Sequence, residues 1–182
     1  MIHIQAPLKK ETVKALKAGD NVLISGVVYA ARDAAHKKLI DLLDEGRELP
    51  FDITGQIIYY VGPCPARPGE IMGSAGPTTS GRMDAYAPAL IERGLAGMIG
   101  KGLRSAEVVN SMVKFGAVYF GATGGAGALI ARSVISEEVL AFPGLGPEAL
   151  RRMVVRDLPA IVIIDSSGDD LYVTGRDRYK IL

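Results

Sequence analysis

The chain has 182 residues, of which 48% are hydrophobic and 23% are charged, and its formal net charge at pH 7 is +1. A chain of this length is expected to bury a substantial core, so we predict a single domain over residues 1–182. The balanced charge and the lack of a basic run argue against a nucleic-acid surface and a polybasic membrane patch. Residues 1–20 lack the apolar stretch of a signal peptide, and no apolar run could span a bilayer, so we expect neither export nor membrane insertion.

Cys64 is the only cysteine in the sequence. One cysteine cannot form an internal disulfide, and alone it cannot hold an iron–sulfur cluster or a structural zinc ion. A free thiol without an export signal indicates a reducing compartment, so we expect a cytoplasmic protein. Between Pro63 and Pro65, a small apolar turn residue is a better interpretation of Cys64 than a reactive thiol. We therefore predict no metal site on this chain.

The first part of the chain predicts two strands, each followed by a helix. Residues 22–29 (VLISGVVY) are rich in β-branched residues and predict a strand, and residues 30–45 carry apolar residues at helical spacing. Residues 53–61 (ITGQIIYYV) predict a second strand, and residues 83–93 predict a second helix. Pro88 fits this helix only in its first turn, where the missing N–H is not needed.

The middle of the chain continues the alternation with shorter elements. Residues 97–100 predict a short apolar strand, and residues 105–115 predict a helix with Ser105 as its N-cap. Residues 117–121 (AVYFG) predict another strand, and residues 126–133 predict the helix that follows it.

The last part of the chain completes the pattern. Residues 138–142 are strand-like, and a Gly-Pro pair opens a predicted helix over residues 146–154. Residues 160–165 and 171–174 predict closing strands around a Ser-Ser-Gly-Asp-Asp turn. The alternation predicts an α/β fold, and interior strands with few polar residues predict a parallel or mixed sheet covered on both faces.

Residues 76–84 (GPTTSGRMD) combine two hydroxyls and a guanidinium in one short segment. The opening Gly-Pro pair ends any preceding strand and leads into a predicted helix. Thr78 and Thr79 then lie at or near the helix N-terminus, where backbone N–H groups favour anions. Arg82 lies one turn further on, and its planar fork matches a carboxylate in two parallel hydrogen bonds. The segment predicts a small anion site with a hydroxyl beside it, and the alternative is a capped helix with a surface arginine.

Four loops are predicted to leave the C-terminal ends of strands, which is where open α/β sheets bind ligands. The loops cover residues 31–36, 76–84, 100–105 and 121–127. Three of them bring positive or hydroxyl side chains to one edge, namely Arg32, Thr78, Arg82 and Lys101. Together these groups predict a cationic pocket suited to a small dianion.

Each of these groups also has a simpler interpretation. Arg32 could pair with Asp33 on the surface, which contributes less than about 1 kcal/mol. Lys101, between two glycines, could be solvated, and a lone histidine such as His36 is more often a structural hydrogen-bonder than a catalyst. Residues 121–127 (GATGGAG) lack the Lys-Ser/Thr ending of a P-loop, which favours close helix–strand packing over phosphate binding.

Residues 76–84, with ARDAAHKKL before them and GKGLRS after them, resemble the β subunit, or C-terminal half, of class I iron–sulfur fumarases and the related tartrate dehydratases. The likeness runs nearly end to end, through YYVGP, VYFGATGGAGAL and EALRRMVVRDLPAIVIIDSSGDDLY. It implies a swivelling β/β/α three-layer domain over residues 1–182, with a mixed, partly parallel sheet. It also implies a cysteine-rich α subunit that holds a [4Fe–4S] cluster, so that the active site lies between subunits and this chain alone is inactive.

The resemblance implies roles for individual residues. Arg32 and Arg82 match the arginines that bind the substrate carboxylates. Lys101 matches a third cationic contact and is expected to take part in catalysis. Thr78 matches the proposed base that moves the C3 proton, helped by an acidic residue of the α subunit, and Thr79 is expected to bind substrate beside it.

Two neighbours of these residues, Asp33 and His36, are expected to support them from behind. Several fused relatives have His-Gly where this chain has Phe115-Gly116, so we expect no catalytic histidine there. A threonine hydroxyl is a poor base at neutral pH. Thr78 therefore acts either as an alkoxide favoured by nearby cations and a helix N-terminus, or as a relay to a partner carboxylate, and both alternatives stay open.

The implied activity is that of a hydro-lyase, the reversible addition of water to fumarate to give (S)-malate, a step of the tricarboxylic acid cycle. Gly81, Asp84 and residues 103–105 look more like fumarases than tartrate dehydratases. The alternatives are an L(+)-tartrate dehydratase β subunit and a non-catalytic dicarboxylate-binding domain that needs no partner. We expect an α2β2 assembly or a β homodimer, with a small dicarboxylate as substrate and no nucleic-acid or membrane partner.

Overall fold

The computed structural model of this protein describes residues 1–177 and Lys180. In chain order, its elements are β1 (Ile2–Ala6), α1 (Lys10–Ala15), β2 (Asn21–Ala30), α2 (Asp33–Asp44), β3 (Ile57–Tyr59), η1 (Ser80–Met83), α3 (Ala87–Glu92), β4 (Gly97–Gly100), α4 (Ala106–Phe115), β5 (Val118–Gly121), α5 (Gly127–Ala131), β6 (Val134–Ala141), η2 (Pro143–Glu148), β7 (Leu150–Ile164) and α6 (Leu171–Asp177). The elements η1 and η2 are 3₁₀ helices.

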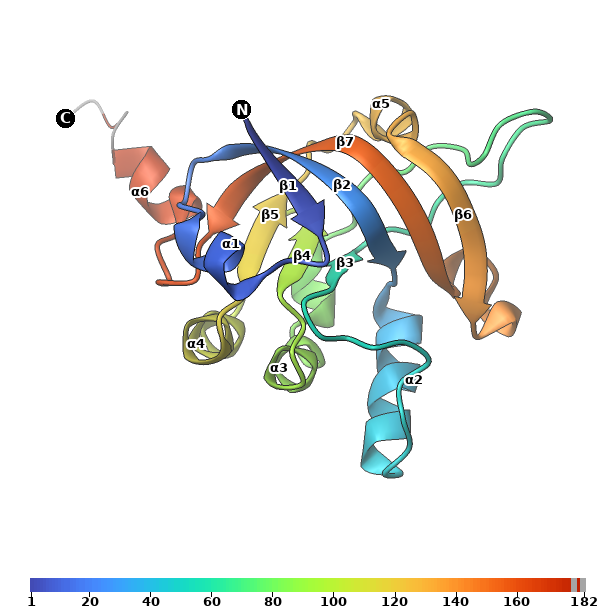
Figure 1. Ribbon diagram of the computed structural model, residues 1–182, viewed down its shortest axis with the longest axis horizontal. Helices are drawn as coiled ribbons and strands as arrows, with labels where there is room; N and C mark the ends of the chain where they lie inside the picture. Colours follow the sequence, from blue (N-terminus) through green and yellow to red (C-terminus); the bar gives the residue numbers. More distant parts are fainter. Residues whose placement is uncertain (178–179, 181–182) are drawn as a thin grey trace.

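The strands form one mixed sheet in the order β1-β2-β3-β4-β5-β7-β6. Strands β1 to β5 run parallel to one another, whereas β7 is antiparallel to β5 and β6. Because β7 also pairs with β2, the sheet turns back on itself. Figure 1 shows three layers: β1, β2, β7 and β6 arch over β3, β4 and β5, and helices α2, α3 and α4 lie beneath. The predicted three-layer α/β domain with a mixed, partly parallel sheet is confirmed.

Alternate side chains of the short inner strands face two separate hydrophobic cores, because successive residues of a strand point to opposite faces. Ile57 and Tyr59 join the core between the two β layers. Ile58 and Tyr60 join the core between the inner strands and the helices. All four side chains are completely buried. The inner strands are therefore covered on both faces, as their low polarity predicts.

Several predicted elements are confirmed almost to the residue. The strands predicted at residues 22–29 and 97–100 are β2 and β4, and the helix predicted at residues 105–115 is α4. The Ser105 hydroxyl accepts a backbone N–H of the first turn of α4, as expected of an N-cap. Pro88 lies in the first turn of α3, where a proline is tolerated.

Two predictions near the C-terminus are wrong. The helix predicted over residues 146–154 ends early, because β7 begins at Leu150 and pairs with both β2 and β6. A short apolar run fits both the 3.6-residue period of a helix and the two-residue period of a strand. Here the pairing with two neighbouring strands makes the segment a strand. The strand predicted at residues 171–174 is part of α6. Asp170 accepts the backbone N–H of Tyr172 at 2.8 Å, and this capping bond prevails over the β propensity of the segment.

The remaining differences concern boundaries and the N-terminus. The helix predicted at residues 126–133 is the shorter α5, and the strand predicted at residues 138–142 belongs to the longer β6. Strand β1 and helix α1 have no counterpart among the predicted elements. The alternation of exposed and buried residues in β1, with Ile4 and Ala6 buried, is a signal that could have identified it.

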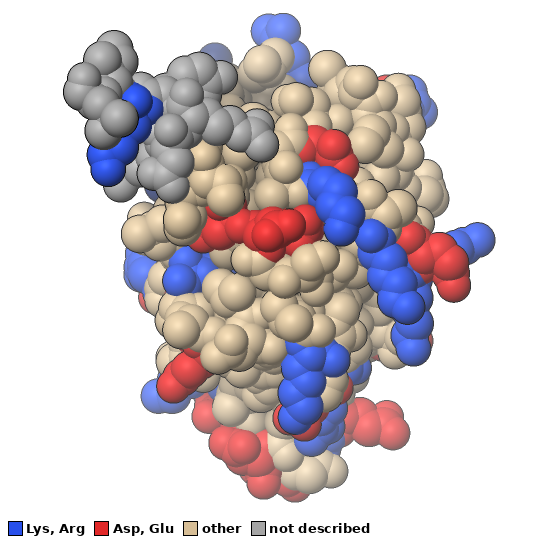
Figure 2. All heavy atoms as spheres, turned by 90° about the vertical axis from the view of Figure 1, so that its left-hand side faces the viewer, with Lys and Arg blue, Asp and Glu red and all other residues tan. Residues whose placement is uncertain are grey.

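None of the described helices is both long and apolar enough to cross a bilayer. Figure 2 shows the face that carries α6, on the left in Figure 1. Basic and acidic side chains are interspersed over the part of this face that the structure describes, and a short acidic stretch lies near its centre.

Candidate active site

The segment of residues 76–84 is held at the carboxyl edge of the parallel strands by backbone hydrogen bonds on both sides. The Thr78 N–H donates to the Tyr60 carbonyl, just after β3, at 2.8 Å. The Ser80 N–H donates to the Lys101 carbonyl, just after β4, also at 2.8 Å. The segment therefore bridges the ends of two neighbouring strands and places its side chains where α/β sheets bind ligands.

Asp33 joins the two arginines that the sequence predicts as carboxylate ligands. An Asp33 oxygen lies 2.6 Å from Nη2 of Arg82, and the other lies 3.8 Å from Nε of Arg32. Nη2 of Arg32 lies 3.2 Å from Oε1 of Glu148. Asp33 begins α2 and Arg82 belongs to η1. The loop after β2 and the 76–84 segment are therefore tied together by side chains at the edge of the sheet.

The two carboxylates make this edge less cationic than the sequence predicts. The pairing of Arg32 with Asp33 is the simpler interpretation considered above, and here it extends to Arg82. The side chains remain partly open to water, with exposed fractions of 23% for Arg32 and 47% for Arg82. The more exposed of these pairs, Arg82 with Asp33, contributes up to about 1 kcal/mol, so a substrate carboxylate can replace it. Glu148 lies in η2, and no local motif marks it in the sequence.

The two threonines and Lys101 lie side by side at this edge. Thr79 forms a parallel β-bridge with Lys101, and both residues are exposed, whereas Thr78 is half-buried. Thr79 is the N-cap of η1, but its side chain makes no capping hydrogen bond. The helix predicted here is only the four-residue η1, with α3 starting at Ala87. A helix dipole therefore contributes less at Thr78 than the sequence predicts.

Gly124, in the loop after β5, lies near the side chain of Lys101. A Cβ added to Gly124 would lie 3.8 Å from the Lys101 Nζ and 3.7 Å from its Cδ. The predicted close packing of residues 121–127 is supported at Gly127, the first residue of α5, where an added Cβ would lie 2.7 Å from the backbone nitrogen of Gly76.

His36 is completely buried behind Arg32. Its Nδ1 lies 2.8 Å from the Arg32 carbonyl oxygen. That oxygen can only accept, so Nδ1 carries the proton. Burial lowers the pKa of His36 to about 4, and the ring is neutral at pH 7. Nε2 has no partner among the described residues, and the ring lies edge-on to Tyr60 at 5.2 Å. This position suits a support for Arg32 and not a proton donor to substrate.

Gly62 allows Arg32 to lie against the chain that leaves β3. A Cβ on Gly62 would lie 2.8 Å from Cδ of Arg32, so the arginine side chain would have to move away from its present position. The glycine of the YYVGP sequence is therefore required for this approach.

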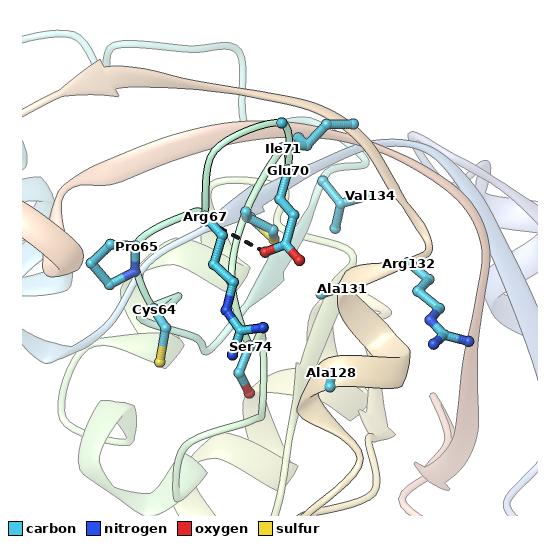
Figure 3. Close-up of a pocket in the computed structure, with 13 residues that line it drawn as sticks. Cys64, Pro65, Arg67, Glu70, Ile71, Ser74, Ala128, Ala131, Arg132 and Val134 are labelled. Atoms are coloured by element: carbon cyan, nitrogen blue, oxygen red, sulfur yellow. Dashed lines mark hydrogen bonds between the residues drawn. The ribbon is translucent and has the colours of Figure 1, made fainter.

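A groove of about 720 Å³ lies away from these residues, between residues 64–74 and α5. Figure 3 shows Cys64, Arg67 and Arg132 around it. The backbone N–H of Arg67 donates to the side-chain carboxylate of Glu70 at 3.4 Å. Cys64 is exposed there. None of the predicted site residues lines this groove, so the candidate site is defined by its side chains and not by cavity size.

Comparison with known proteins identifies the family. A family model described as "Fumarase C-terminus" matches residues 1–175, and the chain belongs to this family. The resemblance inferred from the sequence motifs is thereby confirmed.

Three relatives show how much of a hydratase this chain represents. Fumarate hydratase 2 of Leishmania major is 36% identical over 175 residues, which cover 94% of this chain and 31% of the relative. The anaerobic class I fumarate hydratase of Escherichia coli is 41% identical over 151 residues, or 82% of this chain and 28% of the relative. A provisionally named L(+)-tartrate dehydratase subunit beta of Methanocaldococcus jannaschii is 39% identical over 171 residues, or 91% of this chain and 88% of the relative. The chain thus spans less than a third of the two hydratases but most of the β subunit.

Proposed function

We propose that this chain is the β-type part of a hydro-lyase that adds water to fumarate, giving (S)-malate, and that it supplies the groups that bind the carboxylates and move the C3 proton. The observation that carries the proposal is the convergence of Arg32, Arg82, Thr78 and Lys101 at one sheet edge. Both hydratase relatives named above act, by their names, on fumarate, which supports this substrate.

The arginines of the edge bind the two ends of the dicarboxylate. Asp33 holds Arg82 through one terminal nitrogen, so the guanidinium is oriented before substrate arrives. A substrate carboxylate then meets the fork in two parallel hydrogen bonds or displaces Asp33. Lys101, exposed next to Thr79, stabilises the negative charge that develops when the C3 proton leaves.

Thr78 transfers the proton between its hydroxyl oxygen and C3. In the dehydration direction, the C3–H bond breaks, its electron pair forms the double bond, and the hydroxyl leaves C2. Because η1 is short, Lys101 and the arginines must supply most of the field that favours a threonine alkoxide. The alternative is a relay, in which the Thr78 hydroxyl passes the proton to a carboxylate of the partner chain.

A [4Fe–4S] cluster is expected on the partner and not on this chain. The family resemblance implies three cysteine ligands on the partner, and this sequence has only one cysteine. Among the described residues, no group of three or more His, Cys, Asp or Glu side chains could hold a metal ion. The cluster would supply a Lewis acid for the leaving or attacking oxygen. We propose an α2β2 assembly in the cytoplasm, where a free thiol and an iron–sulfur centre are both kept reduced.

A second candidate, L(+)-tartrate dehydration, is favoured by one observation: the chain covers 88% of a relative named as the β subunit of that enzyme. The decisive experiment is anaerobic co-expression with a cysteine-rich α subunit, followed by assays on fumarate and on L-tartrate. We expect hydration of fumarate only when both chains are present. Turnover of L-tartrate but not of fumarate by the complex would favour the second candidate. Tight binding of a dicarboxylate by the isolated chain, with no activity in any complex, would indicate a binding domain instead.

A further inference from the structure

The side chain of Arg104 is completely buried beneath the candidate site. Its Nε donates to Oδ1 of Asp84 at 2.7 Å, and the Asp84 side chain is 14% exposed. The other Asp84 oxygen accepts the backbone N–H of Ser105 at 2.6 Å. Burial opposes the charge of Arg104, but Tyr60 and Asp84 outweigh it and raise its pKa, so the guanidinium stays charged. A buried charge that is paired and hydrogen-bonded in this way is difficult to move.

Arg104 connects the end of β3 with the two segments that carry Thr78, Arg82 and Lys101. Its Nη2 donates to the Tyr60 hydroxyl at 3.4 Å, and its guanidinium lies over the Tyr60 ring at 5.3 Å. The Tyr60 carbonyl in turn holds the N–H of Thr78. Asp84 lies two residues after Arg82, and Arg104 itself lies three residues after Lys101. One ion pair therefore fixes the backbones of all three segments relative to one another.

Tyr119 extends this buried network to the far side of the segment. The Arg104 guanidinium lies over its ring at 5.0 Å. The Tyr119 hydroxyl donates to the Gly102 carbonyl at 2.9 Å, so the Ser80 hydroxyl must donate to Tyr119, also at 2.9 Å. Any Cβ on Gly100 would overlap the Ser80 hydroxyl oxygen, so a glycine is needed at the end of β4.

We propose that Asp84 and Arg104 form a positioning pair that holds Thr78, Arg82 and Lys101 in the mutual arrangement that catalysis requires. Neither residue touches substrate in this role. The inference rests on the proposed function for its catalytic readout. It also predicts a property of the chain that does not depend on any substrate: without the pair, residues 76–84 and 100–105 lose their mutual order while the sheet stays folded.

The test begins with Asp84→Asn, which keeps the shape of the side chain and removes its charge. The readout is hydrogen exchange of the Thr78 and Ser80 amides in the full chain. Neither amide bonds to Asp84, so faster exchange at these two amides than at amides of the sheet reports a change in the order of the segment. We expect the exchange of both to rise at least about tenfold more than that of the Ile24 and Val28 amides in β2, which report global opening. Unchanged exchange at Thr78 and Ser80 would overturn the proposal.

Kinetics of the co-expressed complex separate positioning from stability. We expect Asp84→Asn to lower kcat/KM by about 10- to 100-fold, mostly through kcat, because small misplacements of catalytic groups act on the transition state. Two controls accompany it. Glu138→Gln, on β6, removes the exposed pair with Arg152 of β7, and Ile24→Val loosens the core between the β layers. Both should leave kcat within about threefold of wild type. A loss in Ile24→Val as deep as in Asp84→Asn would mean that stability alone governs the rate, and the proposal would fail.

The double variant Asp84→Leu/Arg104→Met provides a second test. Replacing a buried ion pair with apolar residues of similar volume often preserves stability. We expect a wild-type denaturation midpoint with low kcat and fast exchange at Thr78 and Ser80. If the double variant had a wild-type kcat and slow exchange at both amides together with a wild-type denaturation midpoint, the proposal would be overturned. Fast exchange in Asp84→Asn, combined with a wild-type complex inactive on fumarate and tartrate, would overturn the proposed function and leave the positioning of the segment intact.

Discussion

The candidate site has two layers of ion pairs with similar bond lengths and very different surroundings. We call the residues Arg32, Asp33, Arg82 and Glu148 the rim, and Asp84 with Arg104 the buried pair. The shortest contacts measure 2.6 Å in the rim and 2.7 Å in the buried pair. The Arg82 side chain is 47% exposed, whereas that of Arg104 is 0% exposed.

Exposure, and not bond length, decides what each layer can do. Water screens an exposed pair and can replace either partner, so rim contacts open readily when a carboxylate ligand competes for them. Breaking the buried pair would leave a charge without water or partner, which costs about 3–5 kcal/mol. The rim therefore suits exchange with substrate, and the buried pair suits permanent positioning.

Thr78 belongs to the same segment as Arg82 and Asp84, and removal of its hydroxyl should have the largest effect. Thr78→Ala is expected to lower kcat by about 10²- to 10⁴-fold, as for loss of a general acid or base. Its N–H bond to Tyr60 is retained, so folding should change little. Steady-state assays of the co-expressed complex measure the loss, with Thr12→Ala on α1 as the matched hydroxyl control. Near-wild-type turnover would remove Thr78 from the mechanism.

The same substitution in each layer tests the contrast directly. Asp84→Asn should lower the free energy of unfolding by about 3–5 kcal/mol, because it leaves Arg104 charged and buried without its partner. Asp33→Asn should lower it by less than about 1 kcal/mol, because the contacts of Asp33 are partly exposed. Denaturant unfolding of the two variants measures both values. Equal losses would mean that exposure does not distinguish the layers.

His36 links the rim to the core and should make stability depend on pH. Its pKa is about 4 when folded, against an ordinary value of about 6.5, so the unfolded chain binds the proton more tightly. Stability from this group is therefore complete above about pH 6.5 and falls as the pH drops towards 4, by up to about 3 kcal/mol. His36→Asn keeps a donor for the Arg32 carbonyl but cannot titrate. If its unfolding free energy fell as steeply as that of wild type between pH 7 and 4, the assignment would be wrong.

Arg82→Lys should have a smaller but measurable effect. The lysine keeps the charge but loses the planar fork, so it cannot make two parallel hydrogen bonds to one substrate carboxylate. We expect kcat/KM to fall by about tenfold, mainly through a higher KM. Arg152→Lys, at the exposed pair on β7, is the control and should not differ from wild type. Equal kinetics for wild type and Arg82→Lys would rule out the bidentate clamp.

Local patterns in the sequence predicted much of the fold. The alternating directions of successive strand side chains divide residues 57–60 between the core of the β layers and the core between the inner strands and the helices. Ser105 marks the start of α4. The order of strands and loops also placed the 76–84 segment at the correct edge. The predictions failed at residues 150–154 and 171–174, where an apolar run fits two periods and only the neighbouring strands or a capping bond decides between them.

The sequence by itself therefore determined the family, the alternation of strands and helices, and the residues that gather at the edge, because short-range spacing carries that information. Only the tertiary structure decided that Asp33 holds Arg82, that Glu148 reaches Arg32, and that Arg104 is buried against Asp84. These contacts join residues that are far apart along the chain. Their strength depends on burial, which is a property of the folded molecule and has no local signature in the sequence.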